Sequence, residues 1–330
     1  MAVGRVALTM ATGTYLHLDA LTSGDVPVEG VDLTCLRLPV EEIFHRFFYD
    51  REWDISEMSL AEYTVGISNG DDSVVGIPVF PSRLFRHRSI YVRSGQVSTP
   101  EDLRGKRVGV PQWTQTAGVY MRAILMHEYG LGLEEMSWYQ AGVNQPGRTD
   151  KVSYKLPAGV RLTSMPNRSL NELMVNGEID CILSAHPPVS FEYGDKRVSR
   201  LFPDFEVVER AYFERHGFLP IMHLIVVRRQ IVDRYPWLLR NLITAFELAR
   251  DRALSRLVDT TASFLPLQWV AKELDYVERV SGQSVWPYGV SPNRRVLENF
   301  IMWAQEQGVL RRAVTIEELF PGSGTEPVRI

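Results

Sequence analysis

Two hydrophobic patterns alternate along the chain. In the first, the residues form apolar runs or alternate between apolar and polar. In the second, apolar residues recur every three to four positions. The first kind is typical of strands and the second of helices. Strands are predicted at 31–38, 53–58, 73–80, 89–92, 106–110, 179–184 and 221–228, after a first strand that begins close to Met1. Helices are predicted at 40–49, 60–67, 117–129, 235–253 and in most of the region up to residue 307, apart from the loop 286–292. This succession of elements predicts an α/β fold.

Single residues mark some of the helix boundaries. Ser169 and Glu172 have the Ser-x-x-Glu spacing that opens a helix, here predicted to run to Val175. Gly130 is a typical C-terminal stop for the helix that precedes it. The strand–loop–helix units change partner near residues 92 and 220, which favours two α/β lobes joined by two crossing strands, with a ligand cleft between them.

Composition narrows the classes of partner. At 330 residues the chain is long enough for two cores, and its net charge of −4 argues against nucleic acid. The near-apolar run 218–227 is far shorter than the ~20 residues of a membrane span, so no membrane partner is expected. Cys35 and Cys181 lack metal-ligand spacing and are expected to be buried thiols in a reducing compartment. With no export signal at the N-terminus, we expect a cytoplasmic protein, and a homo-oligomer is left open.

A basic stretch interrupts two predicted strands. Residues 83–88 hold three arginines and a histidine, directly after Pro81 and Ser82. These two residues break the strand, so that the following side chains can fan into a cleft. Guanidinium groups bind carboxylates through paired hydrogen bonds, which makes Arg83 and Arg86 candidate substrate ligands. The alternative for Arg86 is a solvated rim charge, and Arg88 is expected at the surface.

Longer motifs carry a resemblance to a known family. They are the segments 39–44, 54–60, 77–87, 146–148, 209–213, 220–223 and 286–289. Through them the chain resembles the 4,5-dihydroxyphthalate decarboxylase family. The resemblance implies a two-lobed type II periplasmic-binding-protein-like fold, with residues 1–91 plus 222–330 in one lobe and 92–221 in the other. It also implies cofactor-independent removal of one carboxylate from 4,5-dihydroxyphthalate, giving 3,4-dihydroxybenzoate (protocatechuate) and CO2.

Two positions depart from the family pattern. The loop after the first strand usually carries Tyr-Asp-Arg, whereas this chain has Tyr15, Leu16 and His17. Gln112 stands where an acid often follows Pro111. Because an acid and an arginine are lost at the expected cleft, a related hydroxylated aromatic acid stays open as the substrate.

Three residues are candidates for proton transfer. Histidine suits this task because its ordinary pKa lies near neutrality, and both His87 and His223 match the family motif. A histidine in an apolar strand such as that of His223 is otherwise a satisfied core residue. Glu57 is the rival, because a carboxylate beside arginines could anchor them or accept a ring hydroxyl proton.

Further substrate contacts are expected from both lobes. The turn at 112–116 precedes a helix, where backbone amides favour an anion. Arg148 would close over a second carboxylate, unless it belongs to a flexible surface loop. The other candidates are Gln112, Thr114 and Thr116 as donors, Trp113 as a stacking ring or interface filler, Tyr288 and Asn293 as a wall or packed corner, and His17.

A second class of function stays open. No cluster with metal-ligand spacing and no nucleotide-binding glycine motif appears in the sequence, so no metal and no cofactor is predicted. The same fold could serve a solute-binding protein of the ABC-transporter type, or a sensor, for an aromatic carboxylate. The missing export signal favours the enzyme, whose partner is a small aromatic carboxylate.

Overall fold

Two separate β-sheets organise the computed structural model, which describes residues 4–321. The first sheet has the strand order β2-β1-β3-β11-β4. Its strands are β1 (Val6–Thr12), β2 (Val31–Arg37), β3 (Ile55–Ser59), β4 (Val74–Ile77) and β11 (His223–Arg228). β1 pairs in parallel with β2 and β3, whereas β11 runs antiparallel between β3 and β4.

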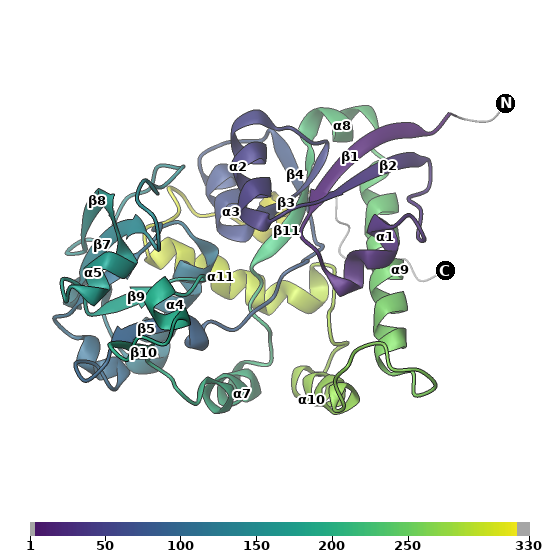
Figure 1. The fold of residues 1–330 in the computed structure, drawn as a ribbon. Helices are drawn as coiled ribbons and strands as arrows, with labels where there is room; N and C mark the ends of the chain where they lie inside the picture. Colours follow the sequence, from purple (N-terminus) through teal and green to yellow (C-terminus); the bar gives the residue numbers. More distant parts are fainter. Residues whose placement is uncertain (1–3, 322–330) are drawn as a thin grey trace.

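The second sheet has the strand order β10-β5-β9-β6-β7-β8. Its strands are β5 (Ile90–Arg93), β6 (Arg107–Val110), β7 (Ser137–Gly142), β8 (Arg161–Ser169), β9 (Cys181–Leu183) and β10 (Val198–Arg200). β6 pairs in parallel with β7 and β9, and β5 runs antiparallel between β9 and β10. Each sheet with its helices forms one of two lobes, which lie side by side in Figure 1.

Helices cover both faces of each sheet (Figure 1). They are α1 (Asp19–Thr22), α2 (Val40–Asp50), α3 (Leu60–Ser68), α4 (Thr116–Tyr129), α5 (Leu170–Val175), α6 (Val189–Glu192), α7 (Phe205–His216), α8 (Arg229–Arg234), α9 (Leu238–Leu257), α10 (Val270–Ser281), α11 (Arg294–Glu306) and α12 (Ile316–Leu319). On the first sheet, α2 and α3 pack on one face and α9 on the other. On the second, α4 and α5 take opposite faces. The α/β architecture expected from the sequence is confirmed.

The predicted elements recur with boundaries shifted by a few residues. Ser59 caps α3 by accepting a hydrogen bond from the backbone of Glu62, and Gly130 ends α4 in the left-handed conformation at φ 61°. Ser169 caps α5 through the backbone of Glu172, as its spacing predicts. None of the described helices is long and apolar enough to cross a membrane.

Two crossing segments connect the two sheets. It leaves the first sheet after β4 and enters the second at β5, so that β5 contains the expected lobe boundary at residue 91. It returns between β10 and β11, beside the expected boundary at residue 222. Arg83 and Ile221 form an isolated antiparallel bridge, so the two crossing segments lie against each other.

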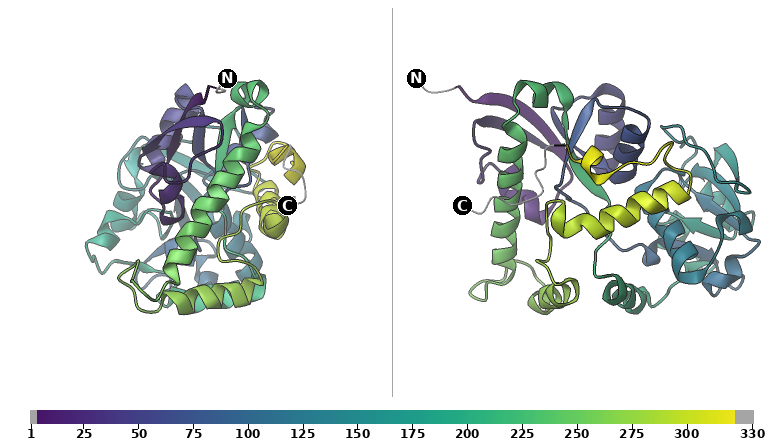
Figure 2. Two further views of the ribbon diagram at one scale, coloured as in Figure 1. Left: turned by 90° about the vertical axis from the view of Figure 1, so that its right-hand side faces the viewer. Right: turned by 180° about the vertical axis from the view of Figure 1, so that it is seen from behind.

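Helix α11 joins the lobes. It runs from the first lobe to the second along one side of the molecule (Figure 2), and its Trp303 ring lies 5.8 Å from that of Tyr120 on α4. After it, α12 contacts α3 of the first lobe, and the hydroxyl of Tyr63 donates to the carbonyl of Leu319. The region that follows the second crossing therefore packs on both lobes.

Candidate active site

A cavity of about 230 Å³ lies between the two lobes. The first lobe lines it from α2, α3 and the start of β11, and the second from the turn before α4 and the loops after β7 and β9. The polar part of its lining comes from Glu41, Ser59, Glu62, Arg86, Gln112, Gln115, Thr116, Arg148, His186 and His223. The cavity is therefore rich in cations and hydrogen-bonding groups, as a site for a small anion requires.

Glu57 is a fully buried carboxylate behind this cavity. Its strand β3 lies between β1 and β11, so its side chain reaches the loop after one and the beginning of the other. Its Oε2 accepts from Thr12 at 3.1 Å and from the amide of Gly13 at 2.7 Å, and its Oε1 from Tyr15 and His223, each at 2.6 Å. Burial opposes ionisation, but the hydrogen bonds, foremost that of His223, hold the pKa of Glu57 below its ordinary value.

Tyr15 is a partner of Glu57 that the sequence did not single out. Burial and the neighbouring Glu57 carboxylate raise the pKa of its hydroxyl well above the ordinary value. The hydroxyl therefore stays protonated and donates to the carboxylate. Its oxygen also lies 3.5 Å from Nδ1 of His223, so the three groups form one compact cluster.

His223 lines the cavity and has one ring nitrogen outside this cluster. Nδ1 is engaged by Glu57, which leaves Nε2 without a hydrogen-bond partner among residues 4–321. The ring of Phe44 packs edge-on against the imidazole at 4.9 Å. Nε2 is therefore the nitrogen through which His223 can exchange a proton with a ligand in the cavity.

Arg86 places a buried positive charge at the same cavity. It is 7% exposed, and no carboxylate of the described residues lies within ion-pair distance of it. Its Nε contacts the sulfur of Met222 at 3.1 Å. Burial, followed by the neighbouring Arg88, lowers the pKa of Arg86 to about 10. The more distant Glu209 carboxylate offsets this effect only in part, and a buried guanidinium without a direct ion-pair partner favours an anionic ligand.

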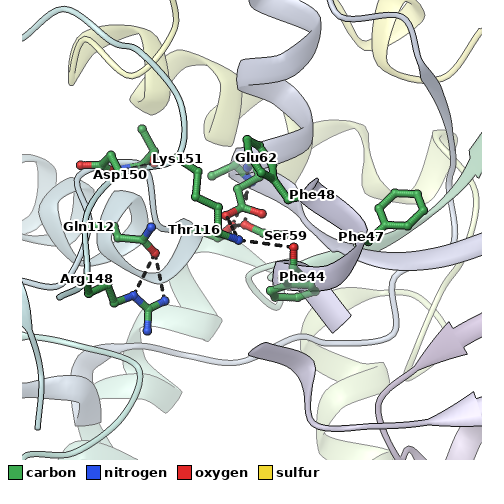
Figure 3. Close-up of polar contacts among 12 residues, drawn as sticks. Phe44, Phe47, Phe48, Ser59, Glu62, Gln112, Thr116, Arg148, Asp150 and Lys151 are labelled. Atoms are coloured by element: carbon green, nitrogen blue, oxygen red, sulfur yellow. Dashed lines mark hydrogen bonds and ion pairs between the residues drawn. The ribbon is translucent and has the colours of Figure 1, made fainter. Parts of the chain in front are cut away.

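The second lobe contributes an amide and a guanidinium that support each other. Gln112 accepts from Nε and Nη2 of Arg148 at 3.1 and 2.9 Å (Figure 3), and its own amide donates to the carbonyl of Thr149 at 2.8 Å. Gln112 therefore orients Arg148, and it is itself 5% exposed. Both predicted binding residues lie at the cavity.

Thr116 joins the two lobes at the cavity. It opens α4, and its hydroxyl lies 2.9 Å from that of Ser59 on the first lobe. The same hydroxyl accepts from the backbone amide of Ala61 at 2.9 Å. Its hydrogen-bonding capacity is thus used in fixing α4 against α3.

Trp113 and Thr114 lie beside the cavity rather than on it. Asp150, which the sequence analysis did not identify, accepts from the backbone amides of Trp113 at 3.1 Å and Thr114 at 3.0 Å and from the Thr114 hydroxyl at 2.7 Å. The Trp113 ring packs edge-on against Trp138 at 5.2 Å in the core. Of the two roles considered for Trp113, stacking on a ligand or filling the interior, the structure shows the second.

Arg83 and Asn293 lie outside the cavity because they bind each other. Nη2 of Arg83 donates to Asn293 at 2.6 Å and to the carbonyl of Pro287 at 2.7 Å. Asn293 also donates to the carbonyl of Gly289 at 2.8 Å. Tyr288 is 4% exposed, and its hydroxyl has no partner in the described structure. This group fastens the loop at 286–293 to the first crossing segment.

Two of the expected histidines are packed among aromatic rings away from the cavity. His87 lies between Phe202 and Tyr212 at ring distances of 5.5 and 5.1 Å, and burial lowers its pKa to about 4. His17 lies between Tyr15 and Trp286 at 5.5 and 5.0 Å, and burial likewise lowers its pKa to about 4. Both are neutral near neutral pH.

Ion pairs across the cleft were missed by the sequence analysis. Glu41 on α2 pairs with His186 of the second lobe, and Glu62 on α3 pairs with Lys151 at 3.1 Å. No local motif signals such pairs, because each joins positions that are far apart in the chain. No group of three or more metal-ligating side chains is present within residues 4–321.

Two curated proteins are similar in sequence over much or all of their length. The chain is 37% identical over 330 residues to a 4,5-dihydroxyphthalate decarboxylase of Comamonas testosteroni, covering 99% of this chain and 100% of the relative. It is 36% identical over 204 residues to a 4,5-dihydroxyphthalate decarboxylase of Pseudomonas putida, covering 61% of this chain and 79% of the relative. No family model matches the chain.

Solved structures share the fold. The periplasmic aliphatic sulphonate binding protein SsuA of Escherichia coli aligns with a TM-score of 0.54 at 10% identity, over 96% of this chain and 98% of that one. The CA3427 gene product of Candida albicans, described as having the generic periplasmic binding protein fold, aligns with a TM-score of 0.50 at 11% identity, over 95% and 93%. This likeness confirms the expected periplasmic-binding-protein-like fold. The full-length relative shows that the chain belongs to the 4,5-dihydroxyphthalate decarboxylase family.

Proposed function

We propose that the protein removes one carboxylate from 4,5-dihydroxyphthalate and releases 3,4-dihydroxybenzoate and CO2. The observation that carries this proposal is that one cavity holds both the unpaired buried Arg86 and the His223 that is backed by Glu57. The first suits a carboxylate and the second suits proton transfer. The names of the two relatives support the choice of substrate.

Arg86 and Arg148 hold the two carboxylates in this proposal. Arg86 has no carboxylate partner in the described structure, so an anion there satisfies a charge that is already buried. Arg148 uses Nε and Nη2 for Gln112, which leaves Nη1 for the ligand. Because they come from the crossing segment and the second lobe, they can fix the ring in one orientation.

His223 protonates the ring carbon that bears the departing carboxylate. Its Nε2 is the nitrogen that Glu57 leaves open, and the lowered pKa of Glu57 keeps a negative charge beside the ring. His87 has no role here, because its ring is enclosed by Phe202 and Tyr212.

The reaction follows from the substrate's own electrons. A hydroxyl para to the departing carboxylate pushes electron density into the ring as its proton is withdrawn. The carbon that carries the carboxylate takes the proton of His223, and CO2 leaves as the bonding electrons return to the ring. The net change is the replacement of one carboxylate by one proton.

Turnover tests the proposal directly. Purified protein is incubated with 4,5-dihydroxyphthalate, and CO2 and the ultraviolet spectrum of the product are followed. His223→Gln is expected to lower kcat by ~10²–10⁴-fold while the protein still binds the substrate. His45→Gln is the matched control, because His45 is an exposed residue on α2 that does not line the cavity. Full turnover in His223→Gln would remove His223 from the mechanism.

A solute-binding or sensor function is the second candidate. The structural relatives with this fold include sulphonate-binding proteins of Escherichia coli and Xanthomonas axonopodis, the latter aligning with a TM-score of 0.50 at 14% identity, over 96% of this chain and 98% of that one. The same incubation separates the two functions. A rise in Tm with 4,5-dihydroxyphthalate but no release of CO2 would favour binding over catalysis.

A cytoplasmic location is part of the proposal. Cys35 and Cys181 are both free thiols in the described structure; Cys181 is buried as expected, whereas Cys35 is only half-buried. Burial raises the pKa of Cys35 to about 11, so this thiol resists oxidation. Unpaired cysteines are typical of a reducing compartment. Fractionation of cells that express the chain tests the location.

A further inference from the structure

Glu62 lines the cavity, and one of its two carboxylate oxygens has no partner. Its side chain is 10% exposed, and its buried Oε2 accepts no hydrogen bond from residues 4–321. Both oxygens of Glu57 are occupied by donors, and Glu41 is an exposed residue that is paired with His186. A buried acceptor without a donor indicates that a ligand supplies one.

Lys151 holds the other oxygen of Glu62 from the opposite lobe. Its ammonium lies 3.1 Å from Oε1 of Glu62 and donates to the carbonyl of Phe44 at 3.4 Å (Figure 3). It also lies 5.2 Å from the centre of the Phe48 ring, and its side chain is 16% exposed. Lys151 thus balances the charge of Glu62 and fixes its orientation without occupying Oε2.

The proposed decarboxylation requires a group that accepts a hydroxyl proton. A phenol releases electrons into its ring far less readily than a phenolate, and His223 is committed to donating a proton. We propose that Oε2 of Glu62 accepts the proton of the ring hydroxyl para to the departing carboxylate, and that Lys151 positions Glu62 for this step. This inference rests on the proposed function and adds the residue that selects a hydroxylated ring.

The proton balance closes within the site. The O–H bond of the hydroxyl breaks and its proton moves to Oε2 of Glu62, while the electron pair enters the ring. The ring carbon forms a C–H bond with the proton of His223, and the C–C bond to the carboxylate breaks to release CO2. The electrons return to the phenolate oxygen, which takes its proton back from Glu62. Only the proton of His223 is consumed, and solvent replaces it.

The Glu62–Lys151 ion pair also links the proton transfer to the approach of the two lobes. Glu62 belongs to α3 and Lys151 to the loop between β7 and β8, so their 3.1 Å contact exists only when the lobes are together. A carboxylate in a site closed to water is a stronger hydrogen-bond acceptor than one in solvent. The base is therefore complete only when the cavity is closed.

Glu62→Gln tests the base, because it keeps the shape of the side chain and removes the acceptor charge. The expected kcat for 4,5-dihydroxyphthalate falls by ~10²–10⁴-fold. Binding of phthalate, which has no hydroxyl, stays as in the wild type and shows that the variant is folded. Glu42→Gln is the control, since Glu42 is an exposed residue on α2 that pairs with Arg46. Unchanged turnover in Glu62→Gln would overturn the inference and leave the proposed function standing.

A binding measurement separates this inference from the proposed function. The ultraviolet spectrum of bound 3,4-dihydroxybenzoate reports whether one of its two hydroxyls has lost a proton, without any turnover. The shift towards the ionised spectrum is expected in the wild type and lost in Glu62→Gln. Identical bound spectra in the two proteins would overturn the role of Glu62, whereas a shifted spectrum without CO2 release from the dihydroxyphthalate would overturn only the decarboxylase.

Lys151→Met tests the positioning role by comparing turnover with binding. Without the ammonium, Glu62 loses the contact that fixes its orientation, so kcat for 4,5-dihydroxyphthalate is expected to fall while the Kd for phthalate stays as in the wild type. Lys151→Arg keeps the positive charge and is expected to restore part of the lost kcat. An unchanged kcat in Lys151→Met, or no recovery in Lys151→Arg, would contradict this role.

Discussion

Arg122 donates its Nε–H to the side-chain oxygen of Gln307 over 2.8 Å, and neither residue is exposed to solvent. The same guanidinium donates to the carbonyl of Trp113 at 2.6 Å, while Gln307 donates to the carbonyl of Val119 at 2.9 Å. A residue that follows α11 therefore supports the turn that brings Gln112 to the cavity. The site depends on a contact between distant parts of the chain.

Gln307→Leu is expected to lower the free energy of unfolding by about 2–3 kcal/mol, because it leaves the buried charge of Arg122 with one acceptor fewer. Urea denaturation measures the change. Gln305→Leu serves as the control, since Gln305 is exposed two positions earlier, and it is expected to change the value by less than ~0.5 kcal/mol. Equal midpoints in the two variants would contradict a structural role for the Arg122 contact.

Glu57→Gln is expected to destabilise the protein by about 3–5 kcal/mol at pH 7, since it leaves His223 without its charged partner. The folded-state pKa of Glu57 is lowered, so its contribution is present above the unfolded value of about 4.3 and is lost as the pH falls through the folded-state pKa. The gap between wild type and variant should therefore narrow in acid. Denaturant unfolding at a series of pH values measures it, and a constant gap would rule out this linkage.

Arg86→Met is expected to act in opposite directions on stability and binding. Removing a buried, unpaired charge stabilises the ligand-free protein, by about 1–4 kcal/mol. The same change removes the anion partner and weakens substrate binding by about 2–5 kcal/mol. Thermal unfolding and calorimetric titration measure the two effects. Arg88→Met, at the next arginine outside the cavity, should leave the Kd unchanged, and a lower Tm in Arg86→Met would argue against the unpaired charge.

His186→Gln is expected to have a pH-dependent effect on stability. The hydrogen bond with Glu41 raises the pKa of His186, against the effect of burial, and the same contact lowers the pKa of Glu41. A raised histidine pKa contributes stability that is full below the unfolded value of about 6.5 and is lost as pH rises through the folded-state pKa. Because both side chains are exposed, the effect should stay below ~1 kcal/mol. Thermal unfolding between pH 5 and pH 9 measures it. A larger loss of stability in the variant at pH 9 than at pH 5 would contradict the prediction.

The elements that the sequence revealed are those with a strong periodic pattern. α2 and β2 begin where they were predicted, because one face of each is apolar and the other polar. β8 was not predicted. Most of its residues are at least partly exposed and it contains Pro166, so it lacks the apolar signal of a buried strand. An edge strand of this kind is held by pairing with β7, which no local pattern reports.

The sequence indicated the types of residue at the site better than the directions in which their side chains point. His223, Arg86 and Arg148 lie at the cavity as the motifs suggested. Arg83 lies three positions before Arg86, yet its guanidinium binds Asn293 instead. The cause is the irregular backbone of the crossing segment, which sends neighbouring side chains in different directions. Neither spacing nor charge could distinguish the two arginines.

The order of amino acids by itself determined the alternation of strands and helices, because periodicity and capping are local properties. It also supplied the motifs from which family membership was expected. The tertiary structure decided which charges meet, since Glu57 with Tyr15, and Glu62 with Lys151, become neighbours only after distant segments pack. Burial then sets what each group can do: it leaves Arg86 in need of an anion and leaves one carboxylate oxygen of Glu62 without a donor.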